Sequence, residues 1–324
     1  MILIVTNKID AHADMVIGRF HETKTSFFRL NTEDFLCAHE INLALSNDSW
    51  RGRLRGTVRG LEVEDVDSIW YRRPKKVSGL QKAGGDDALK FVQREVEVVL
   101  SGLWDILDDR FWMNHPRQNS MAENKIGQLR AARRIGLETP ESIITTSPEE
   151  ALDFIHLHGD VVVKPLGGGF VRHGNEANLI YTNRIVEQNL LHIDSVRECP
   201  TFLQAYVPKS FELRITFISG RFFACKIDSQ KSEKTKDDWR RYDFSAVAHS
   251  PYRLPEDIQD ELARLMLYFG LNFGAIDMIV TPGGKYVFLE INPNGQWGWI
   301  EHLIGMPISQ CIAETLAHPP LGDT

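Results

Sequence analysis

The sequence lacks the features that would place it in a membrane, on nucleic acid or in an oxidising compartment. Its four cysteines lie far apart with no Cys-x-x-Cys pair, so neither a zinc ribbon nor a disulfide framework is indicated. The apolar run at 1–5 is too short for a signal h-region or a membrane span. A net charge of −7 argues against a general nucleic-acid or anionic-membrane binder. We therefore expect a cytoplasmic protein that binds neither nucleic acid nor membranes.

What is present is typical of a globular chain with more than one domain. The 324 residues are 43% apolar and 25% charged, enough for two or three domains. The pattern divides into regions 1–115, 116–200 and 201–324. In the first, strand-like runs at 1–5, 26–30 and 66–71 alternate with helical patterns, including an amphipathic stretch at 86–107. This predicts an α/β domain with a partly parallel sheet.

The second region contains two helix-start patterns. Ser120-Met121-Ala122-Glu123 reads as a capping box, opening a helix that ends at Gly136. Ser147, with Pro148 next and Glu150 three residues on, opens another that runs to Gly159. A strand at 161–163 then leads into a glycine-rich segment.

The third region reads mainly as strands, at 201–207, 211–219 and 221–227, followed by a helix at 256–269. A hairpin with arms at 274–281 and 285–292 closes the pattern, turning at Pro282-Gly283-Gly284.

This hairpin carries three oxygen ligands. Glu290 and Asn292 are two apart on one strand and share a face, and the partner strand can present Asp277 to the same space. A few hard oxygen donors suit magnesium, which keeps waters and binds substrate phosphates. The alternative is three polar residues on a solvated strand face.

Lys164 ends the strand at 161–163, and after Pro165 and Leu166 come Gly167, Gly168 and Gly169. Three glycines let backbone amides approach an anion closely, and a lysine at the end of a buried strand needs a partner, so phosphate is the natural ligand. The pattern is not a P-loop, and a glycine triplet alone is more often a flexible turn.

Other charged residues have weaker patterns. Lys125 lies in the first turns of the predicted helix, where a solvated lysine is the ordinary reading. Glu212 and Arg214 share a strand face, and Arg240 lies in a charged stretch at 231–241 that usually would be a solvated loop. An arginine beside phosphates can neutralise charge in phosphoryl transfer.

Together these pieces resemble the ATP-grasp fold from about residue 110 to the end, with a pre-ATP-grasp α/β domain before it. The resemblance implies ATP and Mg²⁺ as cofactors. It matches Lys125 and Lys164 to the phosphate-contacting lysines and the three glycines to the mobile loop. The remaining matches are Gln204, Ala205, Tyr206 and Val207 to the adenine hinge, Glu212 to the ribose acid, Arg214 and Arg240 to the phosphate-facing arginines, and Asp277, Glu290 and Asn292 to the metal ligands.

Three segments narrow the resemblance: 28–35 (FRLNTEDF), 70–74 (WYRRP) and 292–301 (NPNGQWGWIE). They are similar to the ligases that cyclise microviridin-type precursor peptides, the graspetide synthetases. This implies activation of Asp or Glu side chains as acyl phosphates, with ADP and phosphate released. Thr, Ser or Lys side chains then form ω-ester or ω-amide bonds. It further implies a precursor with leader and core segments as partner, and a homodimer.

Within the third segment, the tryptophans are equally well explained as core, and Gly298 stands where many relatives carry a larger apolar residue. Arg72 and Arg73 follow a strand end, so only one is expected to face the cleft directly and to hold a carboxylate or the acyl phosphate.

Two other functions fit the same residues. One is a RimK-like glutamate or amino-acid ligase, which would add a residue to a peptide instead of removing a water; Ala205 stands where such enzymes often carry an acid. The other is a non-catalytic module that binds nucleotide and peptide. ADP release stimulated by peptide would exclude it.

Overall fold

The N-terminal region is built round a parallel sheet. The computed structural model describes residues 1–324 apart from 48, 79–84, 174–175, 242, 244 and 321–324. Strands β1 (Ile2–Thr6), β2 (Phe27–Asn31), β6 (Ser68–Tyr71) and β7 (Phe111–Met113) lie in the order β2-β1-β6-β7, and all neighbouring pairs are parallel. The expected strands and the parallel sheet are confirmed.

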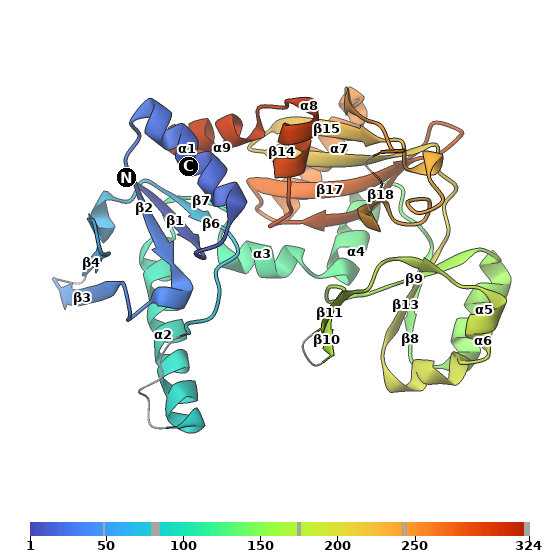
Figure 1. Ribbon diagram of the computed structural model, residues 1–324, viewed down its shortest axis with the longest axis horizontal. Helices are drawn as coiled ribbons and strands as arrows, with labels where there is room; N and C mark the ends of the chain where they lie inside the picture. The colour runs from blue at the N-terminus through green and yellow to red at the C-terminus, as the bar shows by residue number, and fades with distance from the viewer. Residues whose placement is uncertain (48, 79–84, 174–175, 242, 244, 321–324) are drawn as a thin grey trace.

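Helices cover both faces of this sheet (Figure 1). Helix α1 (Ala11–Thr23) and the distant helix α9 (Ile308–Ala317) share a core with Ile4 and Trp70, whereas α2 (Asp86–Ile106) packs on the face of Leu3 and Ile69. The second face is extended by a small antiparallel sheet of β3 (Glu40–Ser46), β4 (Ser49–Arg55) and β5 (Gly60–Glu62), with 3-10 turns at Thr32–Asp34 and Val63–Asp65. The sequence predicted α2 but not this sheet.

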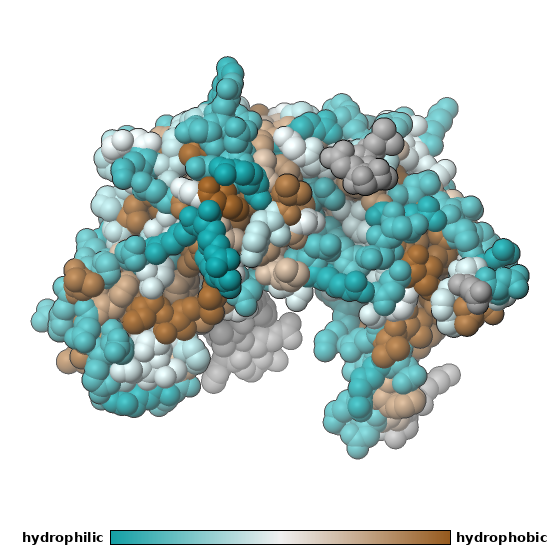
Figure 2. All heavy atoms as spheres, turned by 180° about the vertical axis from the view of Figure 1, so that it is seen from behind, coloured by the Kyte–Doolittle hydropathy of each residue, from teal (hydrophilic) through white to brown (hydrophobic). Residues whose placement is uncertain are grey.

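The middle region forms a lobe of its own. Helices α3 (Pro116–Ala122) and α4 (Lys125–Ile135) lead into an antiparallel sheet in the order β12-β9-β13-β8. Its elements are β8 (Ser142–Thr145), α5 (Pro148–His158), β9 (Val161–Lys164), β12 (Asn183–Arg184), α6 (Glu187–Leu190), a 3-10 turn (Ile193–Glu198) and β13 (Thr201–Ala205). A hairpin of β10 (Phe170–His173) and β11 (Glu176–Leu179) projects from it. Figure 2 shows this lobe and the N-terminal region as separate masses on the lower side.

One helix-start prediction is wrong. Ser120 lies inside α3, which ends at Ala122, and the next helix begins at Lys125 with Asn124 as its N-cap, since the Asn124 side chain accepts from the Gly127 N–H at 3.0 Å. An asparagine caps a helix as well as a serine does. The Ser147 cap and the stop at Gly136 are confirmed.

The C-terminal region contains a five-stranded antiparallel sheet in the order β16-β15-β14-β17-β18. The strands of this sheet are β14 (Phe211–Ile218), β15 (Arg221–Ile227), β16 (His249–Tyr252), β17 (Phe273–Val280) and β18 (Tyr286–Asn292). The same region contains α7 (Glu256–Tyr268), α8 (Gly298–Ile304) and 3-10 turns at Ser229–Lys231 and Trp239–Arg241. Helices α4 and α7 cover the face that carries Leu213, Ile215 and Met278. Alternation therefore directs Glu212, Arg214 and Asp277 to the other face.

In the described part of the chain, none of the helices combines the length and apolarity needed to cross a membrane.

Candidate active site

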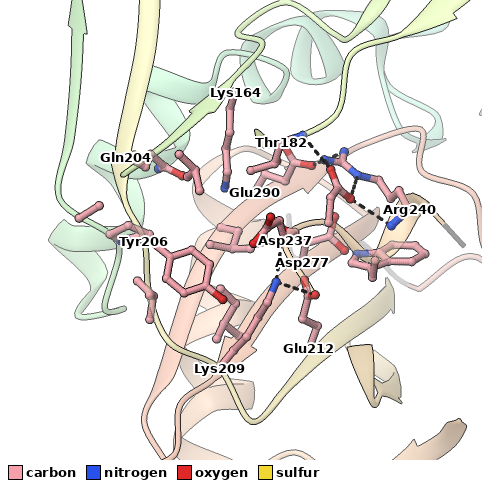
Figure 3. A pocket seen from close by; sticks show the side chains of 18 of the residues that line it. Lys164, Thr182, Gln204, Tyr206, Lys209, Glu212, Asp237, Arg240, Asp277 and Glu290 are labelled. Carbon is pink, nitrogen blue, oxygen red and sulfur yellow. Dashed lines mark hydrogen bonds and ion pairs between the residues drawn. The ribbon is translucent and has the colours of Figure 1, made fainter. Parts of the chain in front are cut away.

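A cleft lies where the sheet of β12, β9, β13 and β8 meets the five-stranded sheet, on the face opposite α4 and α7. It is lined by residues of α4, β9, the segment after β13, the loop 237–240 and strands β17 and β18. Figure 3 shows Lys164 and Lys209 entering it from opposite sides, with Glu290 and Asp277 between them. The fold thus brings together residues from 125 to 290.

Two carboxylates lie at the centre of the cleft, directly opposite each other in the ladder between β17 and β18. Arg214 Nη1 donates to both oxygens of Asp277 at 3.0 Å. Glu290 contacts Lys125 Nζ at 3.1 Å and Arg240 Nη1 at 3.3 Å. A slight irregularity in the ladder follows Asp277, and the two carboxylates remain on one face as the sequence predicts.

The surrounding cations keep Glu290 ionised. Burial alone would raise its pKa, but Lys125, Arg240 and Lys164 lower the pKa of Glu290 to about 2. Burial raises the pKa of Asp277, and Glu290 adds to this rise, while Arg214 opposes it. The pair therefore presents at least one firmly ionised carboxylate to any bound cation.

The donor set fits magnesium. No group of three or more His, Cys, Asp or Glu side chains able to hold a metal is found among the described residues. Asp277 and Glu290 instead supply two carboxylates, and Asn292 is an exposed neighbour two residues further along β18, whose Oδ1 accepts from the Asn294 N–H at 3.0 Å. Two carboxylates and an amide oxygen leave room for the waters and phosphates that magnesium prefers.

Lys164 is the unpaired cation of the cleft. Its ammonium forms neither a hydrogen bond nor an ion pair with any residue that the structure describes. Burial, with the charges of Arg240, Lys125 and Lys209, lowers the pKa of Lys164 to about 8, although Glu290 opposes this. A bound anion would stabilise the buried ammonium and offset its repulsion by Arg240, Lys125 and Lys209, which is consistent with the predicted phosphate site.

Lys125 joins α4 to the glycine-rich segment. Besides contacting Glu290, its Nζ donates to the Pro165 carbonyl at 2.7 Å. Beyond Pro165, Gly167 and Gly168 are exposed, and Gly168 has a φ of +96°. A Cβ at Gly169 would lie 2.1 Å from the Ile180 carbonyl oxygen, so the close approach of these two segments requires glycine there.

The segment 204–207 lines the cleft beside Lys164. Gln204 is buried and donates to Ser142 Oγ. The N–H groups of Ala205 and Tyr206 donate to the Glu141 and Asp160 carbonyls. The Val207 N–H has no partner among the described residues, so it is the amide of this segment that remains available to a ligand.

Two residues that the sequence analysis passed over take part in the cleft. Lys209 Nζ donates to Glu212 Oε1 at 2.8 Å and both side chains are buried, so Glu212 is neutralised within the protein. Asp238 is also buried; it accepts from the Thr182 N–H at 3.0 Å and from Arg240. A charged pair three residues apart and an acid beside Arg240 were visible in the sequence, but their burial was not.

Asp238 fixes the position of Arg240. The guanidinium donates through Nε and Nη2 to the two oxygens of Asp238, each at 2.8 Å, and through Nη1 to Glu290. These carboxylates raise the pKa of Arg240 despite its burial. The end of the stretch 231–241 is therefore packed into the site and is not a solvated loop.

Arg72 and Arg73 differ in burial but not in direction. Arg72 is 1% exposed and Arg73 is exposed, yet Arg72 Nη1 and Arg73 Nε both donate to the Asn294 carbonyl, at 2.7 and 3.0 Å. Both side chains therefore reach the same loop, although strand alternation predicts opposite faces; that only one of them faces the cleft stays a prediction. β6 ends at Tyr71, and Arg73 adopts a φ of +46°, which turns its side chain back toward the same loop.

The tryptophan segment after β18 belongs to the core. Trp297 is fully buried, its backbone N–H donates to His12 Nε2 at 3.2 Å, and the two rings meet edge to face. A Cβ at Gly298 would lie 3.2 Å from both His12 Nε2 and Met15 Sδ. Helix α1 therefore occupies the space that a larger side chain at 298 would need.

The fold is that of the ATP-grasp ligases, and comparisons with known proteins agree. Residues 1–120 match the family model described as the MvdD pre-ATP grasp domain. No curated protein matches the chain.

Three solved structures are similar over nearly the whole chain. A RiPP-associated ATP-grasp ligase of Chryseobacterium gregarium, in complex with ADP and a leader and core peptide, is 29% identical with a TM-score of 0.90, covering 99% of this chain and 97% of that one. The macrocyclase MdnC of Microcystis aeruginosa, bound with precursor peptide MdnA, is 30% identical with a TM-score of 0.85, covering 99% and 100%. The macrocyclase MdnB of the same organism is 31% identical with a TM-score of 0.79, covering 98% and 99%.

The chain belongs to the RiPP-associated ATP-grasp ligases, the family of the microviridin-type macrocyclases.

Proposed function

We propose that this protein uses ATP and Mg²⁺ to phosphorylate side-chain carboxylates of a ribosomal precursor peptide. A Thr, Ser or Lys side chain of the same peptide then displaces phosphate from the acyl phosphate and closes an ω-ester or ω-amide ring, leaving ADP and phosphate. The observation that carries the proposal is the pair Asp277 and Glu290, enclosed by cations that include the unpaired Lys164.

In this proposal the nucleotide phosphates supply the anionic partner that the Lys164 ammonium lacks among the described residues. Lys164 and Lys125 hold the α- and β-phosphates, and the backbone amides at Gly167, Gly168 and Gly169 lie over them. MgATP supplies the phosphoryl group, with the metal bound by Asp277, Glu290 and Asn292. Arg240 and Arg214 are already oriented by carboxylates, so they can neutralise charge on the transferred group without reorganising.

The adenine and ribose take the other end of the cleft. We assign adenine to the segment from Gln204 to Val207, where the free Val207 N–H can donate to a ring nitrogen. Glu212 lies nearby, held by Lys209, and can accept from a ribose hydroxyl while remaining neutralised.

The peptide partner is inferred from the relatives. One is described with a leader and core peptide and another with a precursor peptide. We extend a leader-and-core precursor to this chain. The homodimeric state and the cytoplasmic location are proposed from the sequence alone. Light scattering of the purified protein would test the dimer.

The experiment is incubation with ATP, Mg²⁺ and synthetic precursor candidates rich in Thr, Lys, Asp and Glu. We expect ADP release that depends on peptide, and a loss of one water per ring in the peptide mass. Alkaline hydrolysis opens esters and leaves amides, which distinguishes the two products. A mass gain of one amino acid would indicate the glutamate ligase instead, and ADP release without any change in peptide mass would contradict both.

A further inference from the structure

The loop after β18, residues 293–297, is held by side chains from other segments; we call it the strap. Arg72 and Arg73 donate to the Asn294 carbonyl, and Arg72 also donates to the Gly295 carbonyl at 3.1 Å. Asn114 donates to Pro293, Arg214 donates to Gln296, and His12 accepts from Trp297. The strap therefore links the N-terminal region to Arg214 and to Asn292, which immediately precedes it.

The Nε and Nη2 edge of Arg72 has no hydrogen-bond partner among the described residues, but it is buried and out of reach of a ligand. Its Nη1 is used by two strap carbonyls, its Nε lies 3.7 Å from Asp10 Oδ2, and Nε and Nη2 are buried. The side chain is 1% exposed. A substrate carboxylate could reach this guanidinium only if the strap moved away.

Arg73 has the opposite arrangement. Only its Nε is used, so the Nη1 and Nη2 edge has no partner among the described residues, and no ion pair neutralises it there. Its φ of +46° is costly for a residue with a side chain, the more so before proline. Asn7, itself buried, donates to the Arg73 carbonyl at 2.8 Å and fixes this turn. Strained backbone held in this way is typical of functional positions.

We propose that Arg73 binds a side-chain carboxylate of the peptide through its Nη1 and Nη2 edge, and that Arg72 is a positioning residue that holds the strap. A planar fork of two N–H groups matches a carboxylate bidentately. Arg214 is less suited to this role, because its Nη1 donates to Asp277 and its Nη2 to the Gln296 carbonyl, which leaves it no open Nη1 and Nη2 edge. This division of roles rests on the proposed function, in which a peptide carboxylate must approach the metal site.

Labelling with phenylglyoxal tests the proposal without any turnover. In the wild-type protein with ADP and Mg²⁺, tandem mass spectrometry should find Arg73 modified and Arg72 unmodified. N-acetylglutamate α-amide should slow modification of Arg73, whereas the uncharged N-acetylglutamine amide should not. Modification of Arg72 at the rate of Arg73, or no protection of Arg73 by the carboxylate probe, would overturn the proposal even if the enzyme cyclises peptides.

Kinetics with a peptide that the wild type cyclises, with loss of one water per ring, separate carboxylate binding by Arg73 from positioning of the strap by Arg72. Arg73→Lys should raise the peptide KM by about tenfold to a hundredfold at nearly unchanged kcat, because a charge-assisted bidentate contact is lost. Arg72→Lys should lower kcat with little change in peptide KM, and should raise the Mg²⁺ concentration for half-maximal rate. Arg59→Lys, an exposed arginine on the β4–β5 turn, is the control.

Equal rises in peptide KM for the two variants would contradict the division of roles. If Arg72→Lys does not fold, the Arg73→Lys kinetics and the wild-type labelling still test whether Arg73 binds the peptide carboxylate. If no peptide is processed, the proposed function fails and the labelling alone judges whether Arg73 is a carboxylate site.

Discussion

Glu290 is in contact with two cations, lies near a third, and faces a second carboxylate across the ladder. At the scale of single residues, the positive and negative side chains of the cleft nearly balance, so we expect the loss of one charge to change turnover or ATP binding strongly. Lys164 is the exception, because it has no partner in the described chain. Two experiments address these groups separately.

We expect Glu290→Gln to lower turnover by at least about a hundredfold, because a neutral amide is a weaker magnesium ligand and no longer balances Lys125 and Arg240. Glu138→Gln is the matched control, since Glu138 pairs with Lys285 on the surface. Peptide turnover and thermal melting of both variants provide the measurement. Near wild-type turnover in folded Glu290→Gln would remove this residue from the metal site.

Lys164→Met should weaken ATP binding by about tenfold to a hundredfold near pH 7. The wild type should also show a pH effect that the variant lacks. In the nucleotide-free wild type the pKa of Lys164 is about 8, so above pH 8 the neutral amine must take up a proton before it can hold phosphate, and the affinity for ATP should fall. Calorimetry at pH 7, 8 and 9 measures both effects. A flat profile in the wild type would show that Lys164 does not contact the phosphates.

At the scale of elements, α4 shows where sequence reasoning succeeds and where it fails. Apolar spacing predicted the helix and its end at Gly136, because burial of one face and a left-handed C-cap depend on local sequence. Its start was placed at Ser120, since two short helices in succession give the same pattern as one longer helix. The pairing of Lys209 with Glu212 and the return of α9 to the first sheet depend on contacts made only in the folded chain.

The corrected helix start gives a prediction. Asn124→Ala should lower the free energy of unfolding by about 1 kcal/mol, because the Gly127 N–H loses its cap. Ser120→Ala should have almost no effect, since Ser120 lies within α3 and caps no helix. Urea unfolding of the two variants makes the comparison. An equal loss in both, or a loss in Ser120→Ala alone, would return the helix start to Ser120.

At the scale of the whole molecule, the N-terminal region and the C-terminal segment are joined by a shared core and by the strap. His12 lies at this junction. Burial and the nearby Arg72 lower the pKa of His12 to about 4 although Asp10 opposes them, so the ring stays neutral and accepts from Trp297. The junction therefore depends on an uncharged histidine.

Acid should loosen this junction. The folded pKa of His12 lies below the unfolded value of 6.5, so stability is full above pH 6.5 and is lost as pH falls toward 4. Between pH 7 and pH 5 we expect a loss of about 2 kcal/mol attributable to His12. Denaturant unfolding of the wild type and of His12→Gln at the two pH values tests this. An identical pH dependence in both proteins would exclude His12 as the cause.

The packing of α9 against α1 also bears on how the protein is made. Ser68 Oγ donates to the Leu316 carbonyl, 248 residues further along the chain, and one face of the first sheet is covered by Ile308, Ile312 and Leu316. While the ribosome is still adding residues before α8, that face has α1 but not its second cover. The sheet of β1 and β6 is thus completed by a helix that is translated long after it, and a nascent chain must protect Ile4 and Trp70 from aggregation until then.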